Sequence, residues 1–88
     1  MRLLLVEDTA DVADAIVTSF GHRGDAVDHA SSVDDALDAL AVQDYDVIIL
    51  DIGLPDGLGT DILESLRNRG KATPVLMLTA RSDMSVVI

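Results

Sequence analysis

Residues 46–59 read DVIILDIGLPDGLG, and this stretch decides the fold. Residues 47–50 form an unbroken apolar run rich in β-branched side chains, which is typical of a strand buried on both faces. Asp51 follows this run directly, and Pro55 and Gly57 indicate that the chain then turns. Because α/β proteins bind ligands at the carboxyl ends of their strands, Asp51 is a candidate site residue. The alternative is that Asp51 only begins a turn or caps the next helix.

Strand and helix patterns alternate along the rest of the chain. The other predicted strands cover residues 3–6, 25–29 and 75–78, and helical apolar stripes cover residues 9–20, 33–41 and 57–69. Strands that alternate with helices of this length predict right-handed crossovers, and therefore an α/β fold with a doubly wound parallel sheet. Ser82 and Asp83 look like the start of one more helix.

Composition limits the kinds of partner that this segment would bind. The 88 residues suffice for one small domain and include 16 acidic and six basic side chains, for a formal charge of −10. This balance argues against direct contact with nucleic acid or an anionic membrane, and it suits a cation or a basic partner surface. Most of these acids are expected to lie on solvated helix faces.

The absence of cysteine and of long apolar runs bears on the cellular setting. The chain has no cysteine, which excludes disulfides and thiolate metal sites, and no apolar run long enough to span a membrane. The opening MRLLLVED does not resemble a signal peptide, because its apolar run is short and acids follow it. We therefore expect a cytoplasmic setting.

Polar residues end three of the predicted strands, and parallel strands end at a common edge. Glu7 and Asp8 follow the first strand, Asp51 the third and Thr79 the fourth. Two carboxylates about 4 Å apart repel by ~4 kcal/mol at an effective dielectric of 20, so neighbouring acids here would need a hard cation such as Mg²⁺. A carboxylate beside Mg²⁺ is able to attack phosphorus, and a hydroxyl would bind a phosphoryl oxygen. Each residue alone has a simpler explanation, as a helix start or a strand end.

Three segments together resemble a known family. Residues 6–12 (VEDTADV), the 46–59 stretch and residues 74–83 (PVLMLTARSD) are similar to the receiver domain of bacterial two-component response regulators. The resemblance runs from residue 1 to about residue 85 and is strongest to regulators with a C-terminal winged-helix DNA-binding domain. It implies a flavodoxin-like receiver fold with strand order 2-1-3-4, the fifth βα unit being missing.

The resemblance also implies roles for the candidate residues. Asp51 matches the phosphoacceptor, Asp8 the direct metal ligand and Glu7 the acid that holds a metal-bound water. Gly53 matches the position whose backbone carbonyl binds the metal, which would be Mg²⁺. The phosphoryl donor would be a phosphohistidine on a sensor histidine kinase. Such domains also hydrolyse their own aspartyl phosphate, although they are not enzymes in the usual sense.

Two further roles concern the phosphoryl group itself. Thr79 matches a switch hydroxyl that moves toward this group, and Ala80 matches a small residue whose backbone N–H meets it. The effector that this switch controls would regulate transcription and lies outside these 88 residues.

The chain departs from the family pattern in its last segment. Receivers have a lysine at the end of a fifth strand, whereas Lys71 is the only lysine here and precedes the fourth strand. We therefore expect residues 1–88 to form a truncated receiver domain that binds Mg²⁺ weakly and accepts phosphoryl groups poorly. The strand at residues 75–78 would be left as a bare edge, which predicts a homodimer or other self-association through it.

Two other readings remain open at this point. One is a protein-interaction module that keeps the receiver fold without being phosphorylated. The other is a metal-dependent phosphatase with an aspartate nucleophile, which would need a second acid where Gly53 stands.

Overall fold

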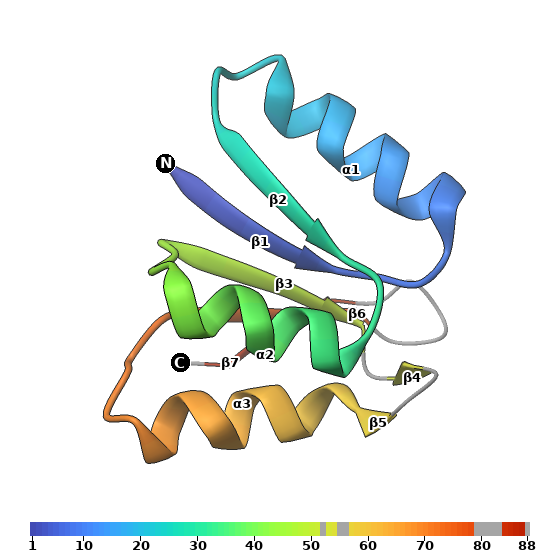
Figure 1. Ribbon diagram of the computed structural model, residues 1–88. Coiled ribbons are helices and arrows are strands. Elements are labelled where there is room, and N and C mark those ends of the chain that lie inside the picture. Colours follow the sequence, from blue (N-terminus) through green and yellow to red (C-terminus); the bar gives the residue numbers. More distant parts are fainter. Residues whose placement is uncertain (52, 55–56, 79–83, 88) are drawn as a thin grey trace.

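The apolar run at the centre of the sequence is also the centre of the sheet. The computed structural model describes residues 1–51, 53–54, 57–78 and 84–87. β3 (Val47–Asp51) lies between β1 (Arg2–Val6) and β6 (Val75–Leu78) and pairs with both in parallel (Figure 1). β2 (Ala26–Ala30) pairs in parallel with the other side of β1. The predicted parallel sheet with strand order 2-1-3-4 is therefore confirmed.

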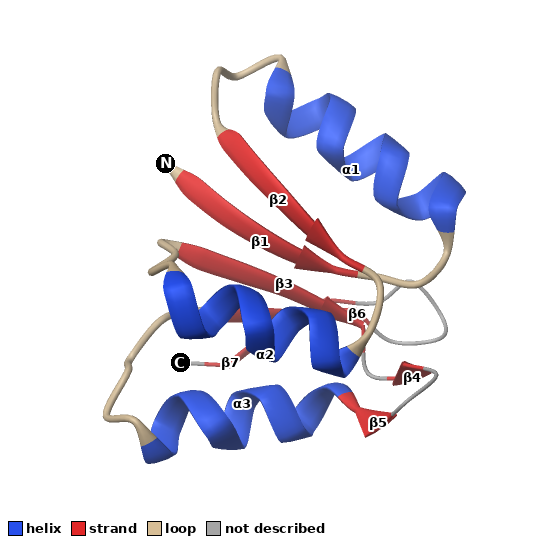
Figure 2. Ribbon diagram, in the orientation of Figure 1, coloured by secondary structure: helices blue, strands red, loops and turns tan. Residues whose placement is uncertain are grey.

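Three helices connect the parallel strands. They are α1 (Ala10–Gly21), α2 (Val33–Val42) and α3 (Gly59–Asn68), each within a few residues of its predicted position (Figure 2). Ser32 caps the start of α2, since its hydroxyl accepts a hydrogen bond of 3.1 Å from the backbone N–H of Asp35. None of the helices in the described part of the chain has the length and apolar character needed to cross a membrane.

The core has two parts because side chains alternate across each strand. On the face covered by α2 and α3, Leu4, Ile48 and Leu50 are fully buried and pack with Ile62 of α3. On the face covered by α1, the buried residues are Leu3, Leu5, Ala13 and Ile49. Both faces of β1 and β3 are thus apolar, which explains their unbroken hydrophobic runs.

The residues after β6 correct one prediction. β7 (Met84–Val87) pairs with β6 in an antiparallel arrangement, so the edge of residues 75–78 is not bare, contrary to the expectation on which self-association through it rested. The physical reason is length: residues 79–83 are too few for the crossover that a parallel partner needs, but enough for an antiparallel connection. A helix was expected to start at residues 82–83, and these residues lie outside the described part of the chain. The next described residue, Met84, begins a strand.

A short antiparallel pair was not predicted. β4 (Gly53–Leu54) and β5 (Gly57–Leu58) form it in the segment between β3 and α3. Two-residue strands leave no periodic pattern in a sequence, so only the structure reveals them.

Tyr45 belongs to the core beneath α2 and α3 and is buried, with 8% of its surface exposed. Its hydroxyl donates a 2.7 Å hydrogen bond to Asp28, whose carboxylate also accepts one of 3.1 Å from the guanidinium of Arg2. Burial, and then the hydrogen bond to Asp28, raise the pKa of Tyr45 to about 12. The hydrogen bond from Tyr45, followed by the charge and hydrogen bond of Arg2, lowers the pKa of Asp28.

We expect a Tyr45→Phe variant to be less stable by about 1 kcal/mol at pH 7. Hydrogen bonds to charged groups contribute roughly 1.5–3 kcal/mol, and the side chain of Asp28 is 40% exposed, which reduces this value. The tyrosine pKa rises from 10.0 to about 12 on folding, so its contribution is complete below pH 10 and is lost as the pH rises toward 12. Urea unfolding of the parent between pH 10 and pH 12 should show a fall in the free energy of unfolding of at most ~2.7 kcal/mol. The variant should not show this fall.

Candidate functional site

Sheet register brings the candidate acids to one edge. Val6 pairs with Leu50 at the carboxyl ends of β1 and β3, and Glu7 and Asp51 are the residues that follow them. Asp51 itself pairs with Leu78 of β6. The parallel pairing of β1 with β3 therefore places Glu7, Asp8 and Asp51 together, although residues 8 and 51 are far apart in the chain.

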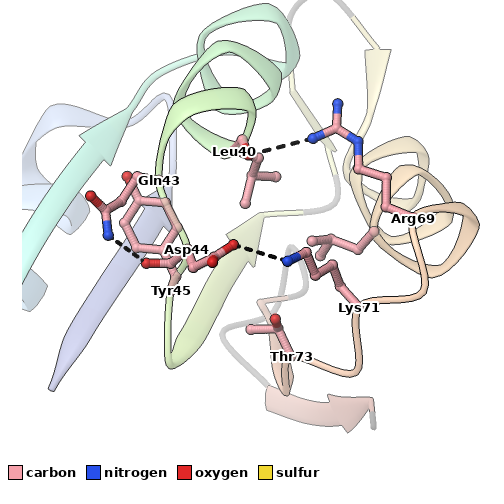
Figure 3. Close-up of a pocket in the computed structure, with 8 residues that line it drawn as sticks. Leu40, Gln43, Asp44, Tyr45, Arg69, Lys71 and Thr73 are labelled. Carbon is pink, nitrogen blue, oxygen red and sulfur yellow. Dashed lines mark hydrogen bonds and ion pairs between the residues drawn. The ribbon is translucent and has the colours of Figure 1, made fainter.

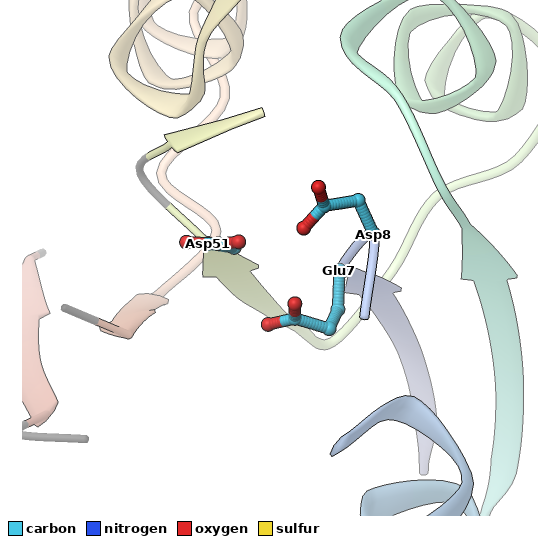
Figure 4. A group of neighbouring side chains, drawn as sticks. All are labelled: Glu7, Asp8 and Asp51. Carbon is cyan, nitrogen blue, oxygen red and sulfur yellow. The ribbon is translucent and has the colours of Figure 1, made fainter. Parts of the chain in front are cut away.

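These three residues, here called the acidic trio, point toward a common space (Figure 4). Each offers one carboxylate oxygen, and these oxygens all lie within 4.8 Å of one another. Glu7 is buried with 5% of its surface exposed, Asp51 is half-buried and Asp8 is exposed. The trio is therefore anchored in the fold on one side and open to solvent on the other.

Backbone contacts fix the position of Glu7. Its carboxylate accepts a 3.0 Å hydrogen bond from the backbone N–H of Thr9, and its own N–H donates to the carbonyl of Ala30 at 3.0 Å. The Nε2 atom of His29 lies 2.8 Å from its backbone oxygen. Glu7 is thereby tied to both the start of α1 and the end of β2.

Electrostatics at the trio favour a cation. Burial raises the pKa of the Glu7 carboxyl, and the negative charges of Asp51 and Asp8 raise it further, against the opposing hydrogen bond from Thr9. Three carboxylates that are crowded together in this way gain most from a hard, oxygen-seeking divalent ion. The donor set therefore fits Mg²⁺, and this acidic cluster is typical of the Mg²⁺ site of receiver domains.

Of the other predicted site residues, the structure describes only Gly53. Gly53 begins β4, two residues past Asp51. Thr79 and Ala80 lie outside the described residues, immediately after β6, whose carboxyl end is at the same edge as Asp51. Their roles stay predictions.

Lys71 lies at the opposite end of the sheet. A small hollow there is lined by residues that include Leu40, Asp44, Arg69 and Lys71 (Figure 3). The Nζ atom of Lys71 is 3.2 Å from a carboxylate oxygen of Asp44, and Arg69 donates a 3.4 Å hydrogen bond to the carbonyl of Leu40. These two contacts link the residues that follow α3 to the end of α2 and to Asp44. Asp44 precedes β3, at the end of the sheet away from the acidic trio, so Lys71 does not neutralise the trio.

An acidic trio at the carboxyl edge of a mainly parallel α/β sheet is typical of the Mg²⁺ site of signalling domains that accept phosphoryl groups. The sequence model of the response regulator receiver domain matches residues 3–88. The chain therefore belongs to the response regulator receiver domain family. Domains of this family generally partner with sensor histidine kinases.

Curated relatives are transcriptional regulators. The response regulator protein PmrA of Pseudomonas aeruginosa is 42% identical over 85 residues, which cover 97% of this chain and 38% of that protein. The transcriptional regulatory protein DltR of Streptococcus agalactiae is 42% identical over 94% of this chain and 37% of its own length. The likeness is to the winged-helix class of regulators, and the chain spans only about 38% of the length of such relatives.

Solved structures agree with the fold. The receiver domain of the Francisella response regulator 1452 superimposes with a TM-score of 0.84 at 30% identity, over 93% of this chain and 68% of that one. The Thermotoga maritima response regulator TrrA, solved in complex with Mg²⁺ and BeF, has a TM-score of 0.82 at 28% identity, over 90% of this chain and 69% of its own. Structures of relatives have thus been solved with Mg²⁺.

The contact of His29 with Glu7 was not foreseen from the sequence. His29 is exposed, yet its ring nitrogen lies within hydrogen-bond distance of the backbone oxygen of Glu7. Residues 22 positions apart show this proximity only once β1 and β2 are paired.

Proposed function

We propose that this chain accepts a phosphoryl group on Asp51 from a phosphohistidine of a sensor histidine kinase, and that it does so with Mg²⁺. The observation that carries the proposal is the acidic trio, whose three carboxylate oxygens lie within 4.8 Å of one another at the carboxyl edge of the sheet. A cytoplasmic setting and control of a transcription-regulating effector belong to the same proposal.

Asp8, Asp51 and the backbone carbonyl of Gly53 would bind the metal directly, and Glu7 would hold a metal-bound water. Bound Mg²⁺ would supply positive charge that offsets the charge of the attacking carboxylate and of the transferred group. Buried Glu7 would contribute a carboxylate whose position is already fixed by Thr9 and Ala30, so little ordering would accompany metal binding.

The transfer exchanges one bond for another. An oxygen of the Asp51 carboxylate forms a bond to phosphorus while the bond from phosphorus to the histidine nitrogen breaks. The electron pair of that bond stays on the imidazole nitrogen, and the product is an acyl phosphate on Asp51. The hydroxyl of Thr79 and the N–H of Ala80 would hydrogen-bond the phosphoryl oxygens.

Phosphorylation of the 88-residue chain is expected to be incomplete and short-lived. A phosphoryl group on Asp51 adds negative charge beside Glu7 and Asp8, and the single lysine is engaged with Asp44 at the other end of the sheet. Because no lysine is available to hold this charge, the acyl phosphate should hydrolyse readily.

The test is labelling with a small phosphodonor and Mg²⁺, followed by intact-mass measurement over time. We expect a transient gain of one phosphoryl group in the parent chain, no gain in an Asp51→Asn variant and no gain when EDTA replaces Mg²⁺. An Asp38→Asn variant is the matched control, because it removes an exposed acid of α2 and should label like the parent. Labelling that persists in Asp51→Asn, or a folded parent that never labels, would overturn the proposal.

A further inference from the structure

The backbone carbonyl of Glu7 has a side-chain donor from the neighbouring strand. The Nε2 atom of His29 lies 2.8 Å from this oxygen. Because a carbonyl oxygen only accepts hydrogen bonds, Nε2 carries the hydrogen and His29 is the donor. Among the described residues no backbone N–H donates to the same oxygen, so His29 is its one protein partner there.

The parallel ladder between β1 and β2 ends at this point. Val6 pairs with Ala30, and the last backbone bond runs from the N–H of Glu7 to the carbonyl of Ala30 at 3.0 Å. β2 stops there, and the chain turns into α2, whose first turn is capped by Ser32. The carbonyl of Glu7 is therefore left without the partner that a longer β2 would supply, and His29 takes that place.

The alternation of side chains along β2 explains how His29 reaches this carbonyl. Val27 packs against the core on the face covered by α1, and His29, two residues further along the strand, lies on the same face. α1 begins at Ala10, directly after residues 7–9, so the end of this face lies next to the acidic trio.

The bond from His29 fixes both acids of this segment, because the peptide group is planar. The carbonyl of Glu7, the N–H of Asp8 and the two Cα atoms lie in one plane, so holding the oxygen sets the direction in which the chain enters Asp8. Glu7 has two other anchors, which are its hydrogen bonds with Thr9 and Ala30. Within the described residues the side chain of Asp8 has neither a hydrogen bond nor an ion pair, so its placement depends on this plane.

We propose that His29 is a positioning residue for the acidic trio: it holds the peptide group between Glu7 and Asp8, so that Asp8 lies close to Asp51 before a metal ion binds. The inference rests on the proposed Mg²⁺ site and adds to it a residue that touches neither the ion nor the phosphoryl group. Less of the site then has to be ordered when the metal binds, which strengthens binding.

Calorimetric titration with MgCl₂ compares the parent with three variants. His29→Phe keeps a planar ring and removes the donor, and we expect Mg²⁺ binding to be roughly three- to tenfold weaker. His29→Gln keeps an N–H at a similar reach and should recover most of the loss. His22→Phe is the matched control, because His22 is also exposed but lies at the far end of α1, and it should bind Mg²⁺ like the parent.

Amide ¹⁵N relaxation without metal separates positioning from a general loss of structure. The order parameter of the Asp8 N–H should fall from a rigid value of about 0.85 in the parent toward about 0.6 in His29→Phe. His29→Gln should restore it, and the amides of β1 and β3 should stay rigid in every variant.

Three results would overturn the inference. They are equal Mg²⁺ affinity in His29→Phe and the parent, equal losses in His29→Phe and His29→Gln, and an Asp8 order parameter that does not change. A parent chain that binds no Mg²⁺ would overturn it as well. These measurements use no phosphodonor, so a parent that binds Mg²⁺ but never labels would defeat the proposed phosphoryl transfer and leave the role of His29 supported.

Discussion

An Asp8→Asn variant is expected to bind Mg²⁺ at least about tenfold more weakly than the parent chain. Loss of an outer partner of a metal ligand costs roughly 10–100-fold in affinity, and the loss of a carboxylate that touches the ion should cost no less. Asp8 is also the most exposed member of the acidic trio, so the substitution should not disturb the core. Calorimetric titration with MgCl₂ measures the difference directly.

The same variant should be slightly more stable than the parent when no metal is present. The negative charge of Asp8 raises the pKa of Glu7. Removing the charge of Asp8 therefore removes an electrostatic repulsion of roughly 1 kcal/mol or less at this exposed position. Lower metal affinity together with higher metal-free stability is expected of a site whose carboxylates repel one another when no ion is bound. Urea unfolding in EDTA and in Mg²⁺ separates the two effects.

An Asp14→Asn variant serves as the control for both measurements. It removes one exposed acid from α1 without touching the trio, so it should change neither the Mg²⁺ affinity nor the gain in stability that Mg²⁺ produces. Equal Mg²⁺ affinity in Asp8→Asn and in the parent would show that these carboxylates do not hold the ion.

A Leu50→Ala variant is expected to lose about 3–5 kcal/mol of stability. Leu50 is fully buried on the central strand and belongs to the core beneath α2 and α3, so truncation leaves a cavity that neighbouring strands cannot fill. Domains of this size are stable by only about 4–13 kcal/mol, so a large fraction of that margin would disappear. The urea midpoint, followed by far-UV circular dichroism, reports the loss.

The matched control is Val42→Ala. Val42 lies at the end of α2 with 85% of its surface exposed, so the same kind of truncation should change stability by less than about 0.5 kcal/mol. A loss for Leu50→Ala as small as that for Val42→Ala would mean that the β3 core contributes little to the fold.

Local patterns in the sequence determined the elements of this protein. The apolar run before Asp51 predicts β3 because a strand covered on both faces needs hydrophobic side chains in every position. Ser31 and Ser32 predict a helix start because a serine hydroxyl can satisfy a free N–H of the first turn, and in the structure Ser32 does so. The positions of Glu7, Asp8 and Asp51 at strand ends followed from the same patterns, since each depends only on neighbouring residues.

Only the tertiary structure decided which of these elements pair and which distant residues come into contact. The pairing of β1 with β3 brings the acidic trio within 4.8 Å, and the pairing of β1 with both β2 and β3 brings Arg2 and Tyr45 to Asp28. The pattern at residues 82–83 predicted a helix start, and only the structure shows that Met84–Val87 pairs with β6 as an antiparallel strand. Contacts between residues far apart in the chain arise from strand order and register, and these are set by packing of the whole sheet.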